Sequence, residues 1–261
     1  MTMRDLLKNI AAVFVLLFTL SPAAPAQSLR ARAASGAKVK EPVDEVEQLL
    51  DRYMLAQGGV ALFKVKTRTV RGRIEMSDSP LTGTFEMYSK APAKVMMVAN
   101  TPLGQIIEVS NGGQRWMQTP WGEMKTASGA GEEMLARAAS GKGGFRWRNA
   151  FSAASLKGTA VIDGRKMIVL DATISGRARM LWYFDAETFL LRKLEFPAQA
   201  GAQETERLCA VYYDSYATVD GVKVAALFRQ VYTNFTLTFR VTDVKHDVLI
   251  EDALFETPNG K

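Results

Sequence analysis

The sequence predicts a mainly β protein of the α+β class, built on one large antiparallel sheet. Apolar residues recur at every second position through most of residues 65–244, which is the period of a half-buried strand. Short polar turns separate these runs, and Asp163-Gly164 and Asp220-Gly221 are typical of two-residue hairpins. No stretch of crossover length separates successive strands, so neighbouring strands are expected to run antiparallel.

The clearest hairpin is predicted at residues 180–196, MLWYFDAETFLLRKLEF. Trp182 and Phe184 precede a short turn that begins at Asp185, and Leu190 and Leu194 follow it. Aromatic and branched residues favour strands, whereas small and acidic residues favour the turn between them. The chain on either side repeats this pattern of short strands and tight polar turns.

Composition limits the classes of function. The 261 residues are 48% hydrophobic, enough for one large domain, and the net charge of +6 is not concentrated in one stripe. With one cysteine, Cys209, and one histidine, His246, an internal disulfide is excluded, and histidine-based triads and multi-histidine metal sites are disfavoured. The sequence shows no nucleic-acid-binding motif, phosphate loop or nucleophile elbow, and we expect no cofactor or metal.

The N-terminal residues are typical of a secretory signal peptide. Arg4 and Lys8 precede an apolar run at residues 10–20, and Ala24-Pro25-Ala26 fits the cleavage pattern, so we expect residues 1–26 to be removed. No cysteine follows the cut, which favours a soluble periplasmic protein without a lipid anchor. Residues 27–42 lack large apolar side chains and are expected to be a disordered leader, followed by a single domain over residues 43–261.

One amphipathic helix is predicted over residues 43–57. Asp44 and Glu47 resemble a capping box, and Gly58-Gly59 would end the helix. The stripe that must be buried against the sheet consists of Val46, Leu49, Leu50, Tyr53 and Met54.

Strands are predicted wherever apolar and polar residues alternate. Gly72 interrupts the first of them and is expected to mark a bulge or bend. A sheet of so many strands curls and leaves one face to be covered. The expected strands are residues 65–76, 84–89, 94–100, 105–110, 115–119, 156–162, 167–174, 180–184, 189–196, 208–216, 222–224, 227–233 and 235–244.

Residues 124–148 break the strand pattern. Several glycines surround one short helical segment at residues 132–139, which is typical of a hinged, movable cover. An excursion without a functional role fits the same residues.

Side chains that could carry catalysis are few. Asp185 and Glu187 could form a carboxylate pair, but their place in a turn favours a structural role. Asp243, His246 and Asp247 could form a weak metal site, although a solvated strand end explains them better. We therefore expect a protein that is not an enzyme.

Several turn motifs occur in a recognisable order along residues 43–258: Leu50-Asp51-Arg52-Tyr53, Gly58-Gly59, Ala91-Pro92-Ala93-Lys94, Asn111-Gly112-Gly113, Tyr183-Phe184-Asp185-Ala186-Glu187-Thr188 and Asp220-Gly221-Val222-Lys223. Their order and spacing resemble those of bacterial outer-membrane lipoprotein-sorting proteins, the LolA/LolB-like group. The sequence departs from that pattern at Phe189, where glycine is typical, and at Val224-Ala225-Ala226, where Leu-Pro is usual.

The resemblance implies an open half-barrel around a hydrophobic cavity, with the N-terminal helix and the helical insertion as a lid over the concave face. It further implies a soluble periplasmic carrier, expected to be monomeric, that binds lipid or lipoprotein acyl chains and moves them across the cell envelope. An inner-membrane exporter or an outer-membrane acceptor would be its partner. The same fold also serves as an envelope sensor or assembly module that binds a protein, so cargo does not follow from fold.

Candidate cavity residues are the bulky apolar side chains of the predicted strands. Each of them could equally belong to an ordinary core. They are Val70, Ile74, Phe85, Met87, Met96, Val98, Ile107, Trp182, Phe184, Phe228, Phe235, Leu237 and Phe239.

Overall fold

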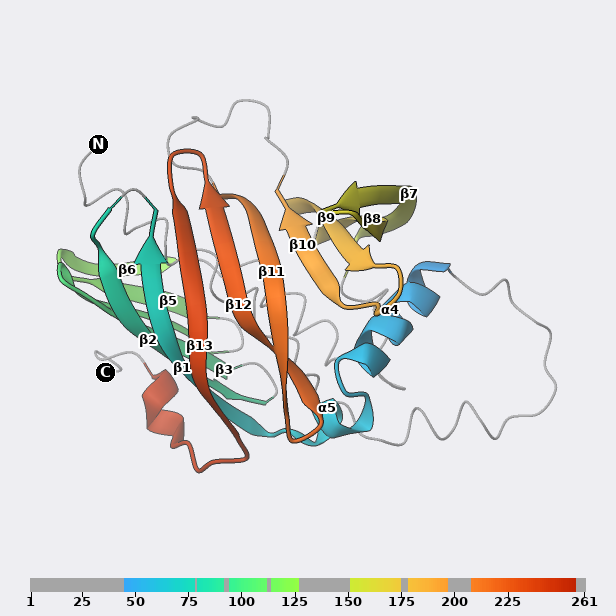
Figure 1. Ribbon diagram of the computed structural model, residues 1–261. Helices are drawn as coiled ribbons and strands as arrows, with labels where there is room; N and C mark the ends of the chain where they lie inside the picture. The colour runs from blue at the N-terminus through green and yellow to red at the C-terminus, as the bar shows by residue number, and fades with distance from the viewer. Residues whose placement is uncertain are drawn as a thin grey trace.

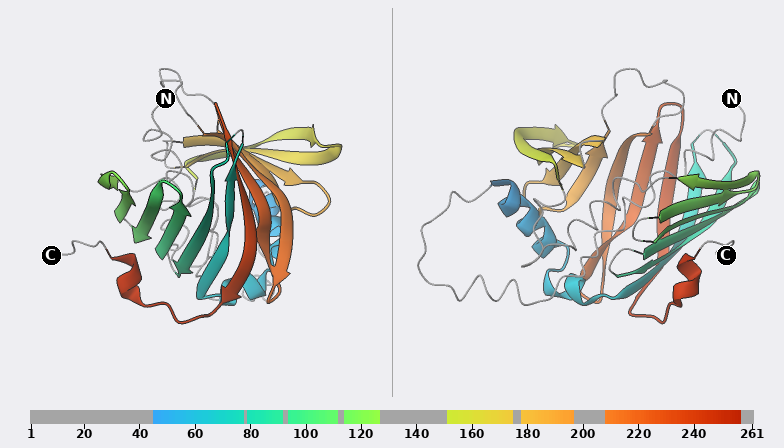
Figure 2. Two further views of the ribbon diagram at one scale, coloured as in Figure 1. Left: turned by 60° about the vertical axis from the view of Figure 1, so that its left-hand side comes forward. Right: turned by 180° about the vertical axis from the view of Figure 1, so that it is seen from behind.

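The computed structural model describes residues 45–77, 79–91, 94–111, 114–126, 151–174, 178–196 and 208–256 (Figure 1). These residues form one 13-stranded sheet in the order β6-β5-β4-β3-β2-β1-β13-β12-β11-β10-β9-β8-β7, in which every paired strand is antiparallel. The sheet curves but does not close, as Figure 2 shows, and β6 and β7 are its edges. The predicted fold class, an open half-barrel with mostly β structure, is confirmed.

The sheet consists of two meanders that follow each other in the sequence. The first contains β1 Thr67–Met76, β2 Thr82–Lys90, β3 Lys94–Thr101, β4 Gly104–Asn111, β5 Gln114–Thr119 and β6 Gly122–Thr126. The second contains β7 Ala153–Ile162, β8 Arg165–Ile174, β9 Ala178–Asp185, β10 Leu191–Glu195, β11 Leu208–Val219, β12 Val222–Tyr232 and β13 Thr236–His246.

The first and last strands, β1 and β13, join the two meanders. Their register runs from Arg68 opposite His246 to Met76 opposite Leu237, and it shifts between Arg71 and Gly72. The predicted irregularity at Gly72 is therefore a β-bulge in the strand pair that holds the two halves together.

Two helices precede the sheet. Helix α4, Glu45–Ala56, buries Leu49, Leu50, Tyr53 and Met54, which confirms the predicted helix and stripe. The short helix α5, Val60–Lys64, was not predicted; it follows Gly58 and Gly59, both with positive φ. A Cβ on Gly58 would lie 2.6 Å from the carbonyl oxygen of Gly221, so only glycine fits between α5 and the β11–β12 turn. Among the described residues, no helix is long and apolar enough to cross a membrane.

Several predicted strands begin or end one to three residues away from the observed ones, and two assignments are wrong. Residues 222–224 and 227–233 belong to one continuous strand, β12, because register shifts opposite β11 absorb the irregular residues between them. Residues 124–126, expected to start the glycine-rich break, instead complete β6 opposite β5. The predicted signal peptide, leader and helical insertion at residues 132–139 lie outside the described residues.

The convex face of the sheet carries a second, smaller core. Residues 247–256, which we call the C-terminal segment, leave β13 and include the 3-10 helix η2, Asp252–Phe255. Ile250 and Phe255 are buried against Val109 of β4 and Trp116 of β5. Figure 2 shows this segment beside β1–β4, on the side away from α4.

We predict that Gly72→Val destabilises the joint between the meanders. A Cβ at this position would lie 2.2 Å from the Arg240 carbonyl oxygen and 2.5 Å from the Phe85 ring. Either the backbone of β13 or the Phe85 ring must therefore move. We expect a loss of about 2 kcal/mol or more in the free energy of unfolding, measured by urea denaturation. Arg73→Val, exposed on the opposite face of β1, should change it by less than about 0.5 kcal/mol.

A second prediction concerns the C-terminal segment. Phe255 is 1% exposed and Leu249 is 90% exposed, although both belong to this segment. Phe255→Ala should cost about 3 kcal/mol in unfolding free energy, because it removes a buried ring, whereas Leu249→Ala should be near neutral. Equal effects of the two substitutions in urea denaturation would show that the segment does not dock on the sheet.

Candidate functional site

The concave face of the sheet carries a continuous apolar surface, which we call the trough. Ten of the thirteen candidate cavity residues lie in the main core on this face and are at most 6% exposed. They come from both meanders, so the trough spans the β1–β13 joint. These ten residues are Val70, Ile74, Phe85, Met87, Trp182, Phe184, Phe228, Phe235, Leu237 and Phe239.

Three phenylalanines form the centre of the trough. The rings of Phe228 and Phe239 stack with centroids 4.7 Å apart, and Phe85 meets Phe239 edge-on at 5.6 Å. Phe85 belongs to β2 and lies over Gly72, whereas the other two belong to β12 and β13. Strands β2, β12 and β13 therefore present one aromatic cluster at the joint between the meanders.

A second aromatic group lies under α4. Trp182 and Phe184 of β9 stack at 6.1 Å, and Tyr53 of α4 meets Phe184 edge-on at 5.2 Å. Phe151 contacts Trp182 from the other side at 5.8 Å. Tyr53 of the helix stripe therefore packs against β9, which confirms that α4 lies over the concave face (Figure 1).

Three candidate cavity residues were assigned to the wrong face. Met96 and Ile107 pack against the convex core, and Val98 shares their side of the sheet because it alternates with the buried Met97 and Ala99. Residues 95–99 are all apolar, since both faces of β3 are covered, so the strand shows no alternation from which its inner face could be chosen.

Sequence reasoning also missed inward-facing residues of β3, β4 and β5. Phe85 pairs with Ala99 and Met87 with Met97, so the cross-strand register could have identified the inner face of β3 once the hairpin between β2 and β3 was assigned. The apolar residues missed in this way are Val95, Met97, Ala99, Ile106 and Met117.

Polar groups interrupt the trough near one rim. Arg68 donates from Nε to Nε2 of His246 at 3.0 Å, and Nδ1 of His246 lies 3.1 Å from Oδ2 of Asp220. A guanidinium can only donate, so His246 accepts at Nε2, carries its proton on Nδ1 and is neutral. Burial, and then the positive charge of Arg68, hold the pKa of His246 below its usual value, although Asp220 opposes them.

A second polar group lies toward the opposite ends of the strands, where β12 ends at Tyr232. Tyr232 donates from its hydroxyl to Oε1 of Gln230 at 3.1 Å. Burial raises the pKa of Tyr232, and the carboxylate of Glu108 on β4 raises it further. Glu108 belongs to β4 and Tyr232 to β12, and four strands separate β4 from β12 in the sheet order.

Asp185, which the sequence suggested as part of a catalytic carboxylate pair, has a structural role in a turn. Asp185 accepts hydrogen bonds from the backbone N–H groups of Thr188 and Glu187 at 2.9 and 3.0 Å. Burial raises the pKa of Asp185, but these bonds and Arg165 outweigh it and leave the pKa below its usual value. Its hydrogen bonds close the β9–β10 turn, in which Phe189 adopts a positive φ of 58°.

The suggested metal ligands do not converge. His246 faces Asp220, whereas Asp247 accepts a hydrogen bond from the backbone N–H of Lys66 at 2.7 Å, and Asp243 pairs with Lys245. Across the described parts of the chain, no three His, Cys, Asp or Glu side chains form a group that could bind a metal ion.

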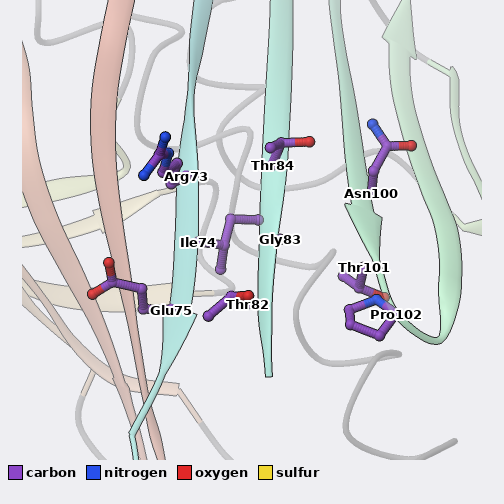
Figure 3. Close-up of a pocket in the computed structure, with 9 residues that line it drawn as sticks. All are labelled: Arg73, Ile74, Glu75, Thr82, Gly83, Thr84, Asn100, Thr101 and Pro102. Atoms are coloured by element: carbon purple, nitrogen blue, oxygen red, sulfur yellow. The ribbon is translucent and has the colours of Figure 1, made fainter. Parts of the chain in front are cut away.

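An open pocket of about 520 Å³ lies at one end of β1, β2 and β3 (Figure 3). Ile74 is the one candidate cavity residue that lines it, and most of the other lining groups are polar, including Arg73, Glu75, Thr84 and Asn100. The pocket thus shares one residue, Ile74, with the trough.

Comparison with known proteins relates the fold to solved structures only. No family model matches the sequence, and no curated protein is similar to it. A DUF1329 family protein from Desulfovibrio piger matches with a TM-score of 0.58 and 13% identity, over 83% of this chain and 98% of that one.

Two further structures share the arrangement. A LolA superfamily protein from Nitrosomonas europaea has a TM-score of 0.56 and 15% identity, over 80% of this chain and 96% of its own. An outer membrane lipoprotein-sorting domain from Vibrio parahaemolyticus has a TM-score of 0.53 and 9% identity, over 80% and 94% of the two chains. At these identities the likeness establishes the fold, and the fold implied by the sequence resemblance is confirmed.

The single histidine allows a direct test of the polar group at the rim. Proton NMR should show one imidazole that titrates below about 6.5, the value of an unperturbed histidine. The unfolded chain then binds more protons than the native one in acid. Stability from this group is complete above pH 6.5 and falls as the pH drops through the native pKa.

Asp220→Asn provides the control for this titration. Asp220 raises the pKa of His246, so its removal should move the NMR midpoint to still lower pH. A midpoint at or above 6.5 in the wild-type protein would contradict the buried, neutral state of the ring.

Proposed function

We propose that this protein is a periplasmic carrier that binds lipid or lipoprotein acyl chains in the trough and moves them across the cell envelope. The observation that carries the proposal is the continuous apolar concave face of an open sheet, built from both meanders. A carrier of this kind needs no catalytic group, and we propose that the protein is not an enzyme. An inner-membrane donor and an outer-membrane acceptor would be its partners.

The free energy of removing an acyl chain from water supports non-covalent binding in the trough. Each methylene removed from water is worth about 0.8 kcal/mol, so a 16-carbon chain left in water costs on the order of 10 kcal/mol. Aromatic and methionine side chains such as Phe228, Met87 and Met97 offer large, adaptable contact surfaces to such a chain. Burial in the trough would therefore offset most of that cost.

Access to the trough requires movement. Its side chains are nearly fully buried, so an acyl chain enters only when segments on the concave face separate from the sheet. Helix α4 is held there by one stripe of four buried residues, and a single 12-residue helix is a small element to displace.

The same burial favours a second candidate function. A trough filled by the protein's own side chains suits an envelope sensor or assembly module that binds a protein partner and carries no lipid. The two functions differ in what the trough holds: a carrier retains lipid, whereas a module retains none.

We predict that delipidated protein exposed to a bacterial membrane extract retains lipid in native mass spectrometry, and that Ala99→Phe reduces this retention. Ala99 faces the trough and is fully buried. If the new ring displaces two methylenes of the bound chain, affinity falls about tenfold, at about 0.8 kcal/mol each.

Val98→Phe is the matched control, because Val98 precedes Ala99 on β3 but faces the convex side. It should retain as much lipid as the wild-type protein, and circular dichroism should show that both variants are folded. A lipid-free wild-type spectrum, together with capture of a defined envelope protein, would replace the carrier with the module.

A further inference from the structure

Arg68 is a buried cation without a carboxylate partner. Its residue is 5% exposed, and Nη2 is buried without a hydrogen-bond acceptor. Among the ion pairs of the described residues, none includes Arg68. Its one side-chain hydrogen bond goes to the neutral ring of His246, whose other nitrogen faces the largely exposed Asp220.

The side chain stays charged despite its burial. Burial lowers the pKa of Arg68 to about 10, which leaves the guanidinium protonated at neutral pH. Removing an ion from water without a nearby counter-charge is strongly unfavourable. An apolar residue of similar size at this position would avoid that cost, so the stability of the sheet does not explain the arginine.

Arg68 lies in a polar row at one rim of the trough, and the row next to it is apolar except for Glu108 of β4. Arg68 lies opposite Ser89 of β2 and, through β3, in the same cross-strand row as Ser110 of β4, whose buried hydroxyl also lacks a partner. This row lies at the ends of the strands, whereas the next rows inward begin with Val70 and Gly72 and are mostly apolar. An amphiphile has the same division between headgroup and chain.

We propose that Arg68 binds the anionic group of an amphiphile, a phosphate or carboxylate, whose chain lies along the trough. This inference rests on the proposed carrier function and narrows its cargo to anionic lipids. The anion would accept a charge-assisted hydrogen bond from Nη2 and supply the counter-charge that the fold lacks. A soluble phosphate offers the same chemistry without the chain.

The test compares three probes on delipidated protein by native mass spectrometry: dioleoylphosphatidylglycerol, dioleoylglycerol and inorganic phosphate. The two lipids carry the same chains and differ in the anionic headgroup. We expect the phospholipid to bind at least about tenfold more tightly, equivalent to about 1.4 kcal/mol, and Arg68→Met to bring the two lipids to similar affinity. Arg71→Met, on the opposite face of β1 and ion-paired with Glu86, should keep the wild-type preference.

The outcomes separate this inference from the carrier function. Equal binding of the two lipids by the wild type, or an unchanged preference in Arg68→Met, overturns the headgroup site and leaves the carrier in place. Binding of phosphate but of neither lipid, lost in Arg68→Met, supports the anion site and overturns the carrier. Binding of no probe overturns both.

A purely structural role of Arg68 predicts a different melting temperature for the lipid-free Arg68→Met protein. If the arginine only positions His246, the lipid-free Arg68→Met protein should melt below the wild type, with the lipid preference unchanged. If Arg68 instead serves to bind an anionic ligand, the lipid-free Arg68→Met protein should melt at the same temperature as the wild type or higher. Should Arg68→Met not fold, Arg68→Gln tests the same contact, because it removes the positive charge while its amide N–H can still donate to His246. An unchanged preference for the phospholipid in Arg68→Gln would overturn the site.

Discussion

The pairing of the first strand with the last is the constraint on which the rest of the structure depends. Each meander is a local structure, but the trough exists only because β1 and β13 lie side by side. The joint is narrow at Gly72, where the bulge and the absence of a side chain let the Phe85 ring lie against the backbone. Phe85 comes from the first meander, and Phe228 and Phe239 come from the second. The aromatic cluster therefore needs both meanders.

The cover on the convex face explains why β3 is apolar on both sides. An antiparallel sheet usually shows one apolar and one polar face, because only one side is covered. Here the C-terminal segment covers β2–β5 from outside with Ile250 and Phe255. Lys94 links this cover to the sheet twice, through an ion pair with Asp252 at 2.7 Å and by lying over the ring of Phe255 at 5.9 Å.

The polar groups of the concave face differ along the trough in the partners that satisfy them. Arg68 and His246 lie at the rim where strand β1 begins and β13 ends, while Gln230 and Tyr232 lie toward the opposite end, where β12 ends. Buried polar groups are costly unless partners satisfy them, and the partners differ between the two sets. Tyr232 and Gln230 bond to each other, whereas Arg68 relies on a neutral ring. The rim is therefore where a charged ligand group gains most.

The sequence by itself determined the period of each strand, the helix stripe and the tight turns, because these features depend on neighbouring residues. Asp163 and Asp220, both with positive φ before a glycine, show this directly. It did not determine which face of β3 points inward, nor the isolation of Arg68. Both depend on segments far away in the chain, the C-terminal segment that covers Met96 and the last strand that brings His246 opposite Arg68. Local patterns set the alternation of side chains, and only the tertiary structure decided what each face meets.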